Sequence, residues 1–313
     1  MIPAPKQKGL DYSILEEKIG SQTKKAICSS VIYGPNASGK TNIIGAMDTM
    51  RSIVLQGNIF NVNESNPNAA ANNLELIPNN QLQERKPVRF FIAFTENNCL
   101  IEFQISIHLG FFLEKDYRKF IGYESLKING LNIYERHNDQ LTLNNLRKLA
   151  SLLKMKSMDL DNLIDISTNS LSPEERFLTN GFKLIISRKM SDLIQGWFKN
   201  KFMVIYKANA LELIRRFDDS DAPGIYVEKT TNEAAKIFGL HANAIGYIHS
   251  DEDQKTKLCL VVREGNSQKN IVINSHVYES YGTINIFPLV LKAMSIGGTL
   301  IIDEFDASIH PMA

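Results

Sequence analysis

The stretch that most constrains the fold is VIYGPNASGKT at residues 31–41, which contains the pattern Gly34-x4-Gly39-Lys40-Thr41. An apolar run precedes it and predicts a strand at residues 27–33. Apolar residues then recur at helical spacing over residues 42–57 and predict a helix. A strand, a glycine-rich loop and a helix in this order form the context of a phosphate-binding P-loop. The alternative is a glycine turn that matches the pattern by chance.

Each residue type in this loop has a physical role in holding phosphate. Gly34 and Gly39 let the backbone curl so that successive N–H groups point at phosphate oxygens, and the following helix adds its positive N-terminal end. Lys40 is placed to reach the β- and γ-phosphates, and the Thr41 hydroxyl to bind Mg²⁺. The candidate nucleotide-binding residues of the loop are Gly34, Asn36, Ala37, Ser38, Gly39, Lys40, Thr41 and Asn42.

A second candidate element, TLIIDE, lies at residues 299–304. Its apolar residues predict a short strand that ends in two carboxylates. Asp303 would hold Mg²⁺ through water, and Glu304 would orient and polarise the water that attacks the nucleotide. The alternative is a strand followed by a solvated acidic turn. Lys40 and Asp303 lie much further apart in the chain than a compact nucleotide-binding domain requires, so we expect an insertion between the two halves of the site.

The intervening sequence predicts a β-lobe followed by a helical insert. Residues 58–87 are rich in Asn and Pro and predict a surface loop. Alternating apolar residues predict a hairpin turning at 96–98, with further turns near 129–130 and 138–139. From about Leu141 to Phe198 the apolar spacing becomes helical, without a heptad repeat long enough for a coiled-coil arm. Further along, the sequence predicts helices at 210–217, 232–248 and 283–294, and a hairpin that turns at 264–269.

Composition favours a soluble cytoplasmic protein. Apolar residues make up 43% and charged residues 22% of the 313, and no window approaches the length of about 18 apolar residues that spans a bilayer. With a net charge of +1, the chain has no strong overall positive potential that would attract nucleic acid. A local contact with DNA stays open, although the lysines of the insert, Lys148, Lys154 and Lys156, are more typical of a solvated helix face. The scattered histidines lack zinc-ligand spacing.

The motifs YGPNASGKTNII, YESYGT and LIIDEFDASIHP resemble ATP-binding-cassette-type ATPases of the SMC-like group. Within that group the chain is most similar to bacterial AAA-family ATPases related to the OLD (overcoming lysogenization defect) proteins and to abortive-infection ATPases. The resemblance implies an α/β P-loop NTPase fold of the ABC/SMC-head type, with an antiparallel β-lobe and a helical insert. It implies one discontinuous ATPase domain: an N-terminal lobe at 1–120, a β/helical insert at 121–200 and a C-terminal lobe at 201–313.

The resemblance also implies ATP and Mg²⁺ as cofactors and a head-to-head homodimer or higher homo-oligomer. In that family an E-S-x-G-T element faces the γ-phosphate held by a second subunit. Here it corresponds to Glu279, with Ser280, Gly282 and Thr283 as the binding residues. His310 lies in the segment that crosses the dimer interface in the family, although a residue before Pro311 is also typical of a turn. Lys40 and Glu304 are the implied catalytic residues.

By resemblance, the expected function is an ATP-driven switch, an ATP hydrolase acting in bacterial anti-phage defence or DNA maintenance and controlling a nuclease or toxin effector. Compared with the family, the chain looks trimmed at both ends and lacks the segment with the switch histidine. Two alternatives are a non-catalytic nucleotide-binding scaffold and the ATPase part of an OLD-type nuclease whose nuclease domain is absent.

Overall fold

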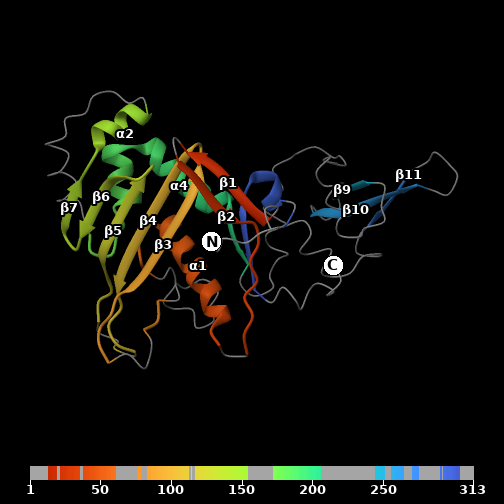
Figure 1. The fold of residues 1–313 in the computed structure, drawn as a ribbon. Coiled ribbons are helices and arrows are strands. Elements are labelled where there is room, and N and C mark those ends of the chain that lie inside the picture. Colours follow the sequence, from red (N-terminus) through yellow and green to blue (C-terminus); the bar gives the residue numbers. More distant parts are fainter. Residues whose placement is uncertain are drawn as a thin grey trace. The chain divides into compact units, whose positions relative to one another are not determined.

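The computed structural model covers Met1–Ala313, which divide into two compact units, Met1–Lys199 and Asn200–Ala313. It describes residues 13–19, 22–35, 38–60, 76–78, 83–112, 114, 117–153, 172–205, 244–250, 255–263, 270–274, 290 and 292–303. Helices and an antiparallel sheet make up most of the described part of the first unit, and the second unit contains a parallel strand pair and a small antiparallel sheet (Figure 1).

The first unit begins with a two-stranded antiparallel hairpin of β1 (Ile14–Ile19) and β2 (Gln22–Ile27). The last bond of its ladder runs from the N–H of Cys28 to the carbonyl of Ser13, 2.8 Å away. Residues 28–35 have no regular secondary structure and are exposed. The predicted strand at 27–33 is therefore wrong beyond Ile27. In the described part of this unit β2 pairs only with β1, which begins at Ile14 and leaves residues 29–33 without a partner strand.

Helix α1 (Lys40–Gln56) confirms the helix predicted after the glycine-rich loop. It ends at Gly57, which has the left-handed φ of 82° and donates its N–H to the carbonyl of Ile53. Of the predicted apolar face, Ile43 is exposed, and burial concentrates in the C-terminal half of the helix. The buried residues of α1 are Gly45, Thr49, Met50, Ile53 and Val54. The helix is therefore fixed by packing mainly at the end away from the loop.

A five-stranded antiparallel sheet forms the centre of the first unit (Figure 1), with its strands in chain order. The strands are β3 (Val88–Glu96), β4 (Cys99–His108), β5 (Phe120–Ile128), β6 (Leu131–His137) and β7 (Gln140–Leu143). The three predicted turns are confirmed. Asn97 and Asn98 both have positive φ, as do Asn129 and Gly130, and Asn138 has a φ of 51°. Paired positive φ values, as in the first two turns, are typical of two-residue hairpin turns of the right twist.

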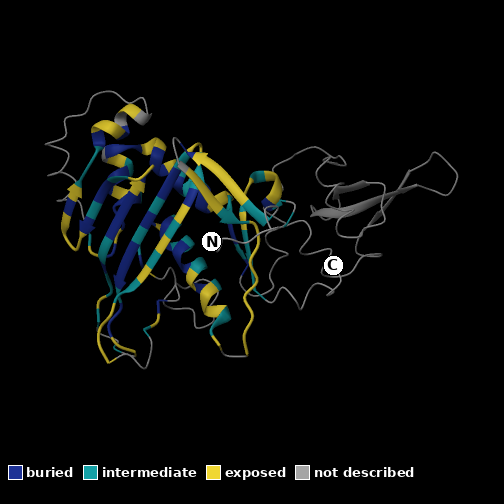
Figure 2. Ribbon diagram, in the orientation of Figure 1, coloured by how far each residue is buried: buried dark blue, intermediate teal, exposed yellow. Residues whose placement is uncertain are grey.

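One face of this sheet carries the core. Alternate residues of β4 are fully buried, namely Ile101, Phe103, Ile105 and Ile107, and Figure 2 shows the burial concentrated in the central strands. The ring of Phe94 on β3 stacks on Trp197, with ring centroids 3.9 Å apart, and meets Phe198 edge-on. Both partners belong to α4 (Arg188–Asn200), so this helix covers the sheet.

The predicted helical insert is confirmed in part. Helix α2 (Leu146–Leu153), the π-helix η3 (Leu178–Ile186) and α4 lie within it, and residues 154–171 fall outside the described part. Residues 141–143, however, belong to β7, and residues 172–177 are not helical. Pro173 disfavours a helix there, and the backbone of this stretch bonds elsewhere: the Ile59 N–H donates to Glu174, and the Arg176 N–H donates to Gly57.

In the second unit, β8 (Phe202–Ile205) and β12 (Thr299–Ile302) pair in parallel. Leu300 and Ile302 pack against the buried Ile205. The predicted TLII strand is thus confirmed, whereas β8 was not predicted from the sequence. Residues 292–294 are helical, as expected, and the helix continues to residue 296 before it stops at Gly297, whose φ is 61°.

The rest of the described second unit is an antiparallel sheet in the order β11-β10-β9. Its strands are β9 (Ala244–Ser250), β10 (Lys255–Arg263) and β11 (Asn270–Asn274), which confirms the hairpin around 264–269. The helix predicted for 232–248 is wrong from Ala244 onward, because that segment pairs with β10 along its length and the pairing overrides a weak helical pattern. The predicted helix at 210–217 lies outside the described residues, as do 232–243 and 283–289.

Candidate nucleotide-binding site

The described part of the glycine-rich loop is a tight turn that leads into α1. The N–H of Ser38 donates to the carbonyl of Pro35 at 3.2 Å, and the N–H of Ile43 donates to Gly39 at 3.3 Å as the first helical turn forms. Asn36 and Ala37 lie outside the described residues. The loop therefore curls back on itself directly before the helix, as the P-loop prediction requires.

Both fixed glycines are explained by this geometry. A Cβ atom added at Gly34 would lie 2.7 Å from Oγ of Ser38, closer than real Cβ contacts allow. Gly39 has a φ of 90° and ψ of 13°, a left-handed conformation that side chains rarely adopt. Gly34 thus leaves room for the side chain of Ser38 across the turn, and Gly39 permits the left-handed backbone that leads into the helix.

Lys40 joins the two ends of the loop. Its Nζ donates hydrogen bonds to the carbonyl oxygen of Gly34, 2.7 Å away, and to that of Pro35, 2.9 Å away. The ammonium group is therefore held directly over the turn that was predicted to surround phosphate. A lysine at this place brings a positive charge to any anion that enters the turn.

The start of α1 is favourable for an anion as well. The first turn has no acidic residue, and no side chain in the described part of the chain caps its backbone N–H groups. Thr41 and Asn42 are exposed there. The positive end of the helix therefore adds to the charge of Lys40 without a competing carboxylate.

The carboxylate half of the predicted site lies in the second unit. Asp303 directly follows β12, and its N–H donates to the carbonyl of Ile205 at the end of β8, 3.1 Å away. The carboxyl ends of the two parallel strands thus lie side by side at this residue. In α/β folds, ligands bind at the carboxyl ends of the parallel strands. Glu304, Ser280, Gly282, Thr283 and His310 lie outside the described residues. The pairing of Asp303 with Thr41 at one metal ion stays a prediction.

A polar network that sequence reasoning missed lies next to the stretch that bonds to the far end of α1. The Glu124 carboxylate of β5 is fully buried and accepts hydrogen bonds from the Tyr134 hydroxyl (2.8 Å) and from the N–H groups of Phe177 and Leu178 (2.9 and 3.1 Å). This carboxylate therefore caps the entry to η3. The available signal was that Glu124 in YESLKI and Arg176 in PEERFL are charged residues close to apolar ones.

Burial shifts the pKa values of this network. Desolvation, with the charge of Glu124, raises the pKa of Tyr134 well above its ordinary value. Desolvation lowers the pKa of Arg176, and the charge of Glu124 opposes that shift. The guanidinium of Arg176 lies over the ring of Phe103, 5.2 Å from its centroid, and its nitrogen atoms have no hydrogen-bond partner among the described residues. Glu124 is thus its main electrostatic counterpart.

The match to a known protein family agrees with the prediction of a P-loop. A family model described as "AAA domain, putative AbiEii toxin, Type IV TA system" matches residues 29–313, a span that includes the glycine-rich loop, α1 and Asp303. Neither the curated proteins nor the solved structures contain a significant match to the chain. None of the helices in the described part of the chain is long and apolar enough to cross a membrane.

Proposed function

Because the chain belongs to the AAA-domain family described as a putative AbiEii toxin of a Type IV toxin–antitoxin system, we propose that it hydrolyses ATP with Mg²⁺ and works as a dimerising, ATP-driven switch. Membership of this family implies an α/β fold of the P-loop NTPase type, and it implies nucleotide binding in general. Hydrolysis by this chain, its assembly and its control of a partner are the proposal.

The observation that carries the proposal is the position of Lys40. Its ammonium bonds to the carbonyls of Gly34 and Pro35 and lies over the glycine-lined turn. An entering triphosphate would offer charged oxygens in place of these neutral carbonyls, and hydrogen bonds between charged groups are the stronger kind. The N–H groups at the start of α1 add to this attraction.

The remaining roles follow from the chemistry of the side chains. The Thr41 hydroxyl and the Asp303 carboxylate would hold Mg²⁺, which when bound neutralises charge on the β- and γ-phosphates. Glu304, next to Asp303 in the chain, would accept a proton from the attacking water and orient it. Lys40 would stabilise the negative charge that develops on the transferred phosphoryl group.

The finer parts of the proposal concern assembly. By the resemblance to OLD-like ATPases of the SMC-like group, Ser280, Gly282 and Thr283 of one copy would face the γ-phosphate bound by the other, with His310 at the interface. ATP binding would then close a homodimer, and hydrolysis would reopen it. The toxin–antitoxin description of the family supports a protein partner for such a switch, acting as a toxin or nuclease effector in anti-phage defence.

The test is ATP turnover measured together with mass in solution, with and without ATP and Mg²⁺. We expect turnover in the wild-type chain, its loss in Lys40→Ala and Glu304→Gln, and an ATP-dependent dimer that Glu304→Gln stabilises. Lys189→Ala is the matched control, since Lys189 is an exposed lysine in the first turn of α4. It should leave turnover unchanged.

Other results would favour a different function. ATP binding without turnover, with the same mass in both nucleotide conditions, would favour a nucleotide-binding scaffold. Absence of ATP binding in the wild-type chain would contradict both functions.

A further inference from the structure

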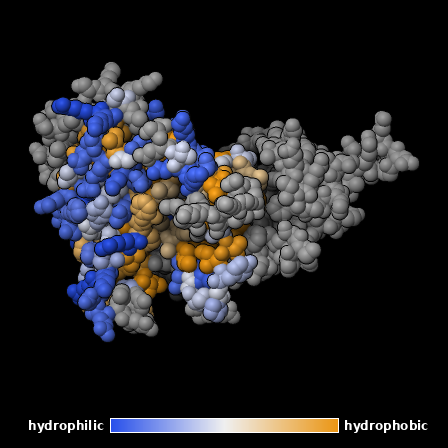
Figure 3. Space-filling view, in the orientation of Figure 1, coloured by the Kyte–Doolittle hydropathy of each residue, from blue (hydrophilic) through white to orange (hydrophobic). Residues whose placement is uncertain are grey.

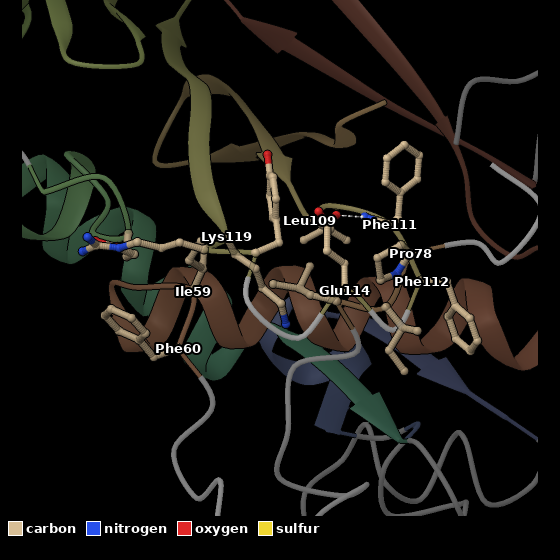
Figure 4. Close-up of a pocket in the computed structure, with 13 residues that line it drawn as sticks. Ile59, Phe60, Pro78, Leu109, Phe111, Phe112, Glu114 and Lys119 are labelled. Atoms are coloured by element: carbon tan, nitrogen blue, oxygen red, sulfur yellow. Dashed lines mark hydrogen bonds and ion pairs between the residues drawn. The ribbon is translucent and has the colours of Figure 1, made fainter. Parts of the chain in front are cut away.

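A cavity of about 490 Å³ lies in the first unit (Figure 4). Ile59 and Phe60, just after α1, line it together with side chains of the segment between β4 and β5. In the view of Figure 4, Phe60 and Phe112 lie at opposite ends, with Leu109 and Glu114 between them. Its volume is in the range of ligand and side-chain pockets, about 300–1,000 Å³.

Several of the apolar side chains that line the cavity are exposed. Phe60 is 52% exposed, Ile77 67% and Phe112 44%. Figure 3 shows that most of the coloured surface on the visible face is hydrophilic, with apolar side chains gathered in a few patches. A small molecule inside the cavity would leave these rim side chains in water, whereas a docked protein segment would cover them. Clustered exposed apolar residues of this kind are typical of protein–protein contact sites.

The rim also offers a positive charge. Nε of Arg118 donates to the carboxylate of Glu174, whose side chain is only 3% exposed, while Arg118 itself is 78% exposed. Among the described residues, Arg118 is bonded only through Nε, so its two terminal amino groups can receive a second carboxylate. The other carboxylate of the pocket, Glu114, is already engaged by Arg85 at 2.5 Å and by the N–H of Phe111 at 2.8 Å.

The pocket is connected to the P-loop through α1. The N–H of Ile59 donates to the carbonyl of Glu174 at 3.1 Å, and the N–H of Arg176 donates to Gly57 at 2.9 Å. These two bonds anchor the end of the helix that begins at Lys40. Phe60 follows Ile59 in the chain, and Arg118 bonds to the side chain of Glu174. A segment that contacts Phe60 and Arg118 therefore touches the immediate neighbours of the bonds that anchor α1.

We propose that this pocket docks a segment of a partner protein that places an aromatic or branched aliphatic side chain in the cavity and a carboxylate on Arg118. Docking is coupled through α1 to nucleotide binding. The docking stands on the pocket alone, and the coupling rests on the proposed ATP binding.

The probe for docking is a library of short random peptides displayed on phage and selected on the full chain without nucleotide. We expect enriched peptides to carry an aromatic or branched aliphatic residue close to Asp or Glu. The affinity of the best peptide, measured by fluorescence anisotropy, should fall about tenfold or more in Phe112→Asp and in Arg118→Gln, since one well-placed contact is worth about 1.4 kcal/mol or more.

The variants are chosen so that a loss of peptide affinity through unfolding can be distinguished from a loss of the docking contact. Glutamine at position 118 keeps a donor for Glu174 while removing the charge. Phe91→Asp is the matched control for Phe112→Asp, because Phe91 is a 63% exposed phenylalanine on β3 that does not line the pocket. Circular dichroism and thermal unfolding of each variant report the fold. Docking is overturned if no peptide is enriched, if the enriched peptides lack acidic residues, or if Phe112→Asp binds them as the wild type does.

The coupling has its own readout. The selected peptide should change the affinity for ATP by about fivefold or more, and ATP should change the affinity for the peptide by the same factor. Equal ATP affinity with and without peptide would overturn the coupling. A chain that binds the peptide but no ATP would contradict the proposed function while leaving the docking intact.

Discussion

The backbone N–H of Arg176 donates a hydrogen bond to the carbonyl of Gly57, 2.9 Å away, and so attaches the end of α1 to the stretch that precedes η3. The same stretch is held from the other side by Arg136 of β6. Its Nη1 and Nη2 donate to the carbonyls of Glu175 and Ser172, 2.6 and 2.7 Å away. The helix that begins at the candidate phosphate loop is thus joined to the central sheet through residues 172–177.

Gly34→Ala should weaken nucleotide binding without unfolding the chain. The new Cβ would lie 2.7 Å from Oγ of Ser38, so the Ser38 side chain or the loop around it must shift. We expect the affinity for ATP, measured with a fluorescent analogue, to fall by about tenfold or more, since phosphate binding in the loop depends on close backbone approach. Gly196→Ala is the control, because a Cβ there meets nothing within 4 Å. Equal losses in both variants would contradict the prediction.

Glu124→Ala should be strongly destabilising. It removes the acceptor of three buried hydrogen bonds and leaves the guanidinium of Arg176 buried without its counter-charge. Leaving three buried donors without their acceptor costs about 3 kcal/mol or more of unfolding free energy, measurable by urea titration. Glu84→Ala, at a surface ion pair, should cost about 1 kcal/mol or less.

A second variant tests whether charge causes that loss. In an Arg176→Met background the buried guanidinium is gone, so Glu124→Ala should cost clearly less there than in the wild type. If the cost is the same in both backgrounds, the hydrogen bonds alone account for it, and the electrostatic account of Arg176 is wrong.

The stability of the chain should fall at alkaline pH because of Tyr134. In the folded chain its pKa is raised by burial and by Glu124, whereas in the unfolded chain it has the ordinary value of 10.0. The raised pKa contributes stability that is fully present below pH 10 and is lost as the pH rises above it. Tyr134→Phe should therefore flatten the dependence of unfolding free energy on pH in that window.

Asn98→Gly should stabilise the first unit. Asn98 has a φ of 60° in the turn between β3 and β4, where glycine avoids the steric cost of a side chain. The change creates the Asn-Gly pair preferred in such hairpins, and we expect a gain of about 0.5–1 kcal/mol in unfolding free energy by urea titration. A loss of stability would mean that the entropy of the unfolded glycine outweighs the relief of strain in this turn.

Local chemistry explains which elements could be predicted from the sequence. The Asn129-Gly130 turn, the helix after Lys40 and the strand before Asp303 each depend on the residues of a short segment. The segment 28–33 has strand-like composition, but it forms no strand in the described fold because a strand needs a partner. The segment 244–250 shows the reverse, since pairing with β10 makes a strand from residues with a helical pattern.

The candidate site divides in the same way. Gly34, Gly39 and Lys40 could be assigned because their roles belong to one continuous loop. The anchoring of α1 could not, because it links Gly57, Glu124 and Arg176, which are far apart in the sequence and meet only after the chain has folded.

The strand order of the central sheet has a consequence for how the chain folds during synthesis. Every pair from β3 to β7 joins strands that are neighbours in the sequence, so this sheet can form as soon as its own residues leave the ribosome. The parallel pair is different, because β8 must wait for β12, which is translated much later. The strand that leads to Asp303 is therefore expected to take its place late, after the domain containing the phosphate loop has begun to fold.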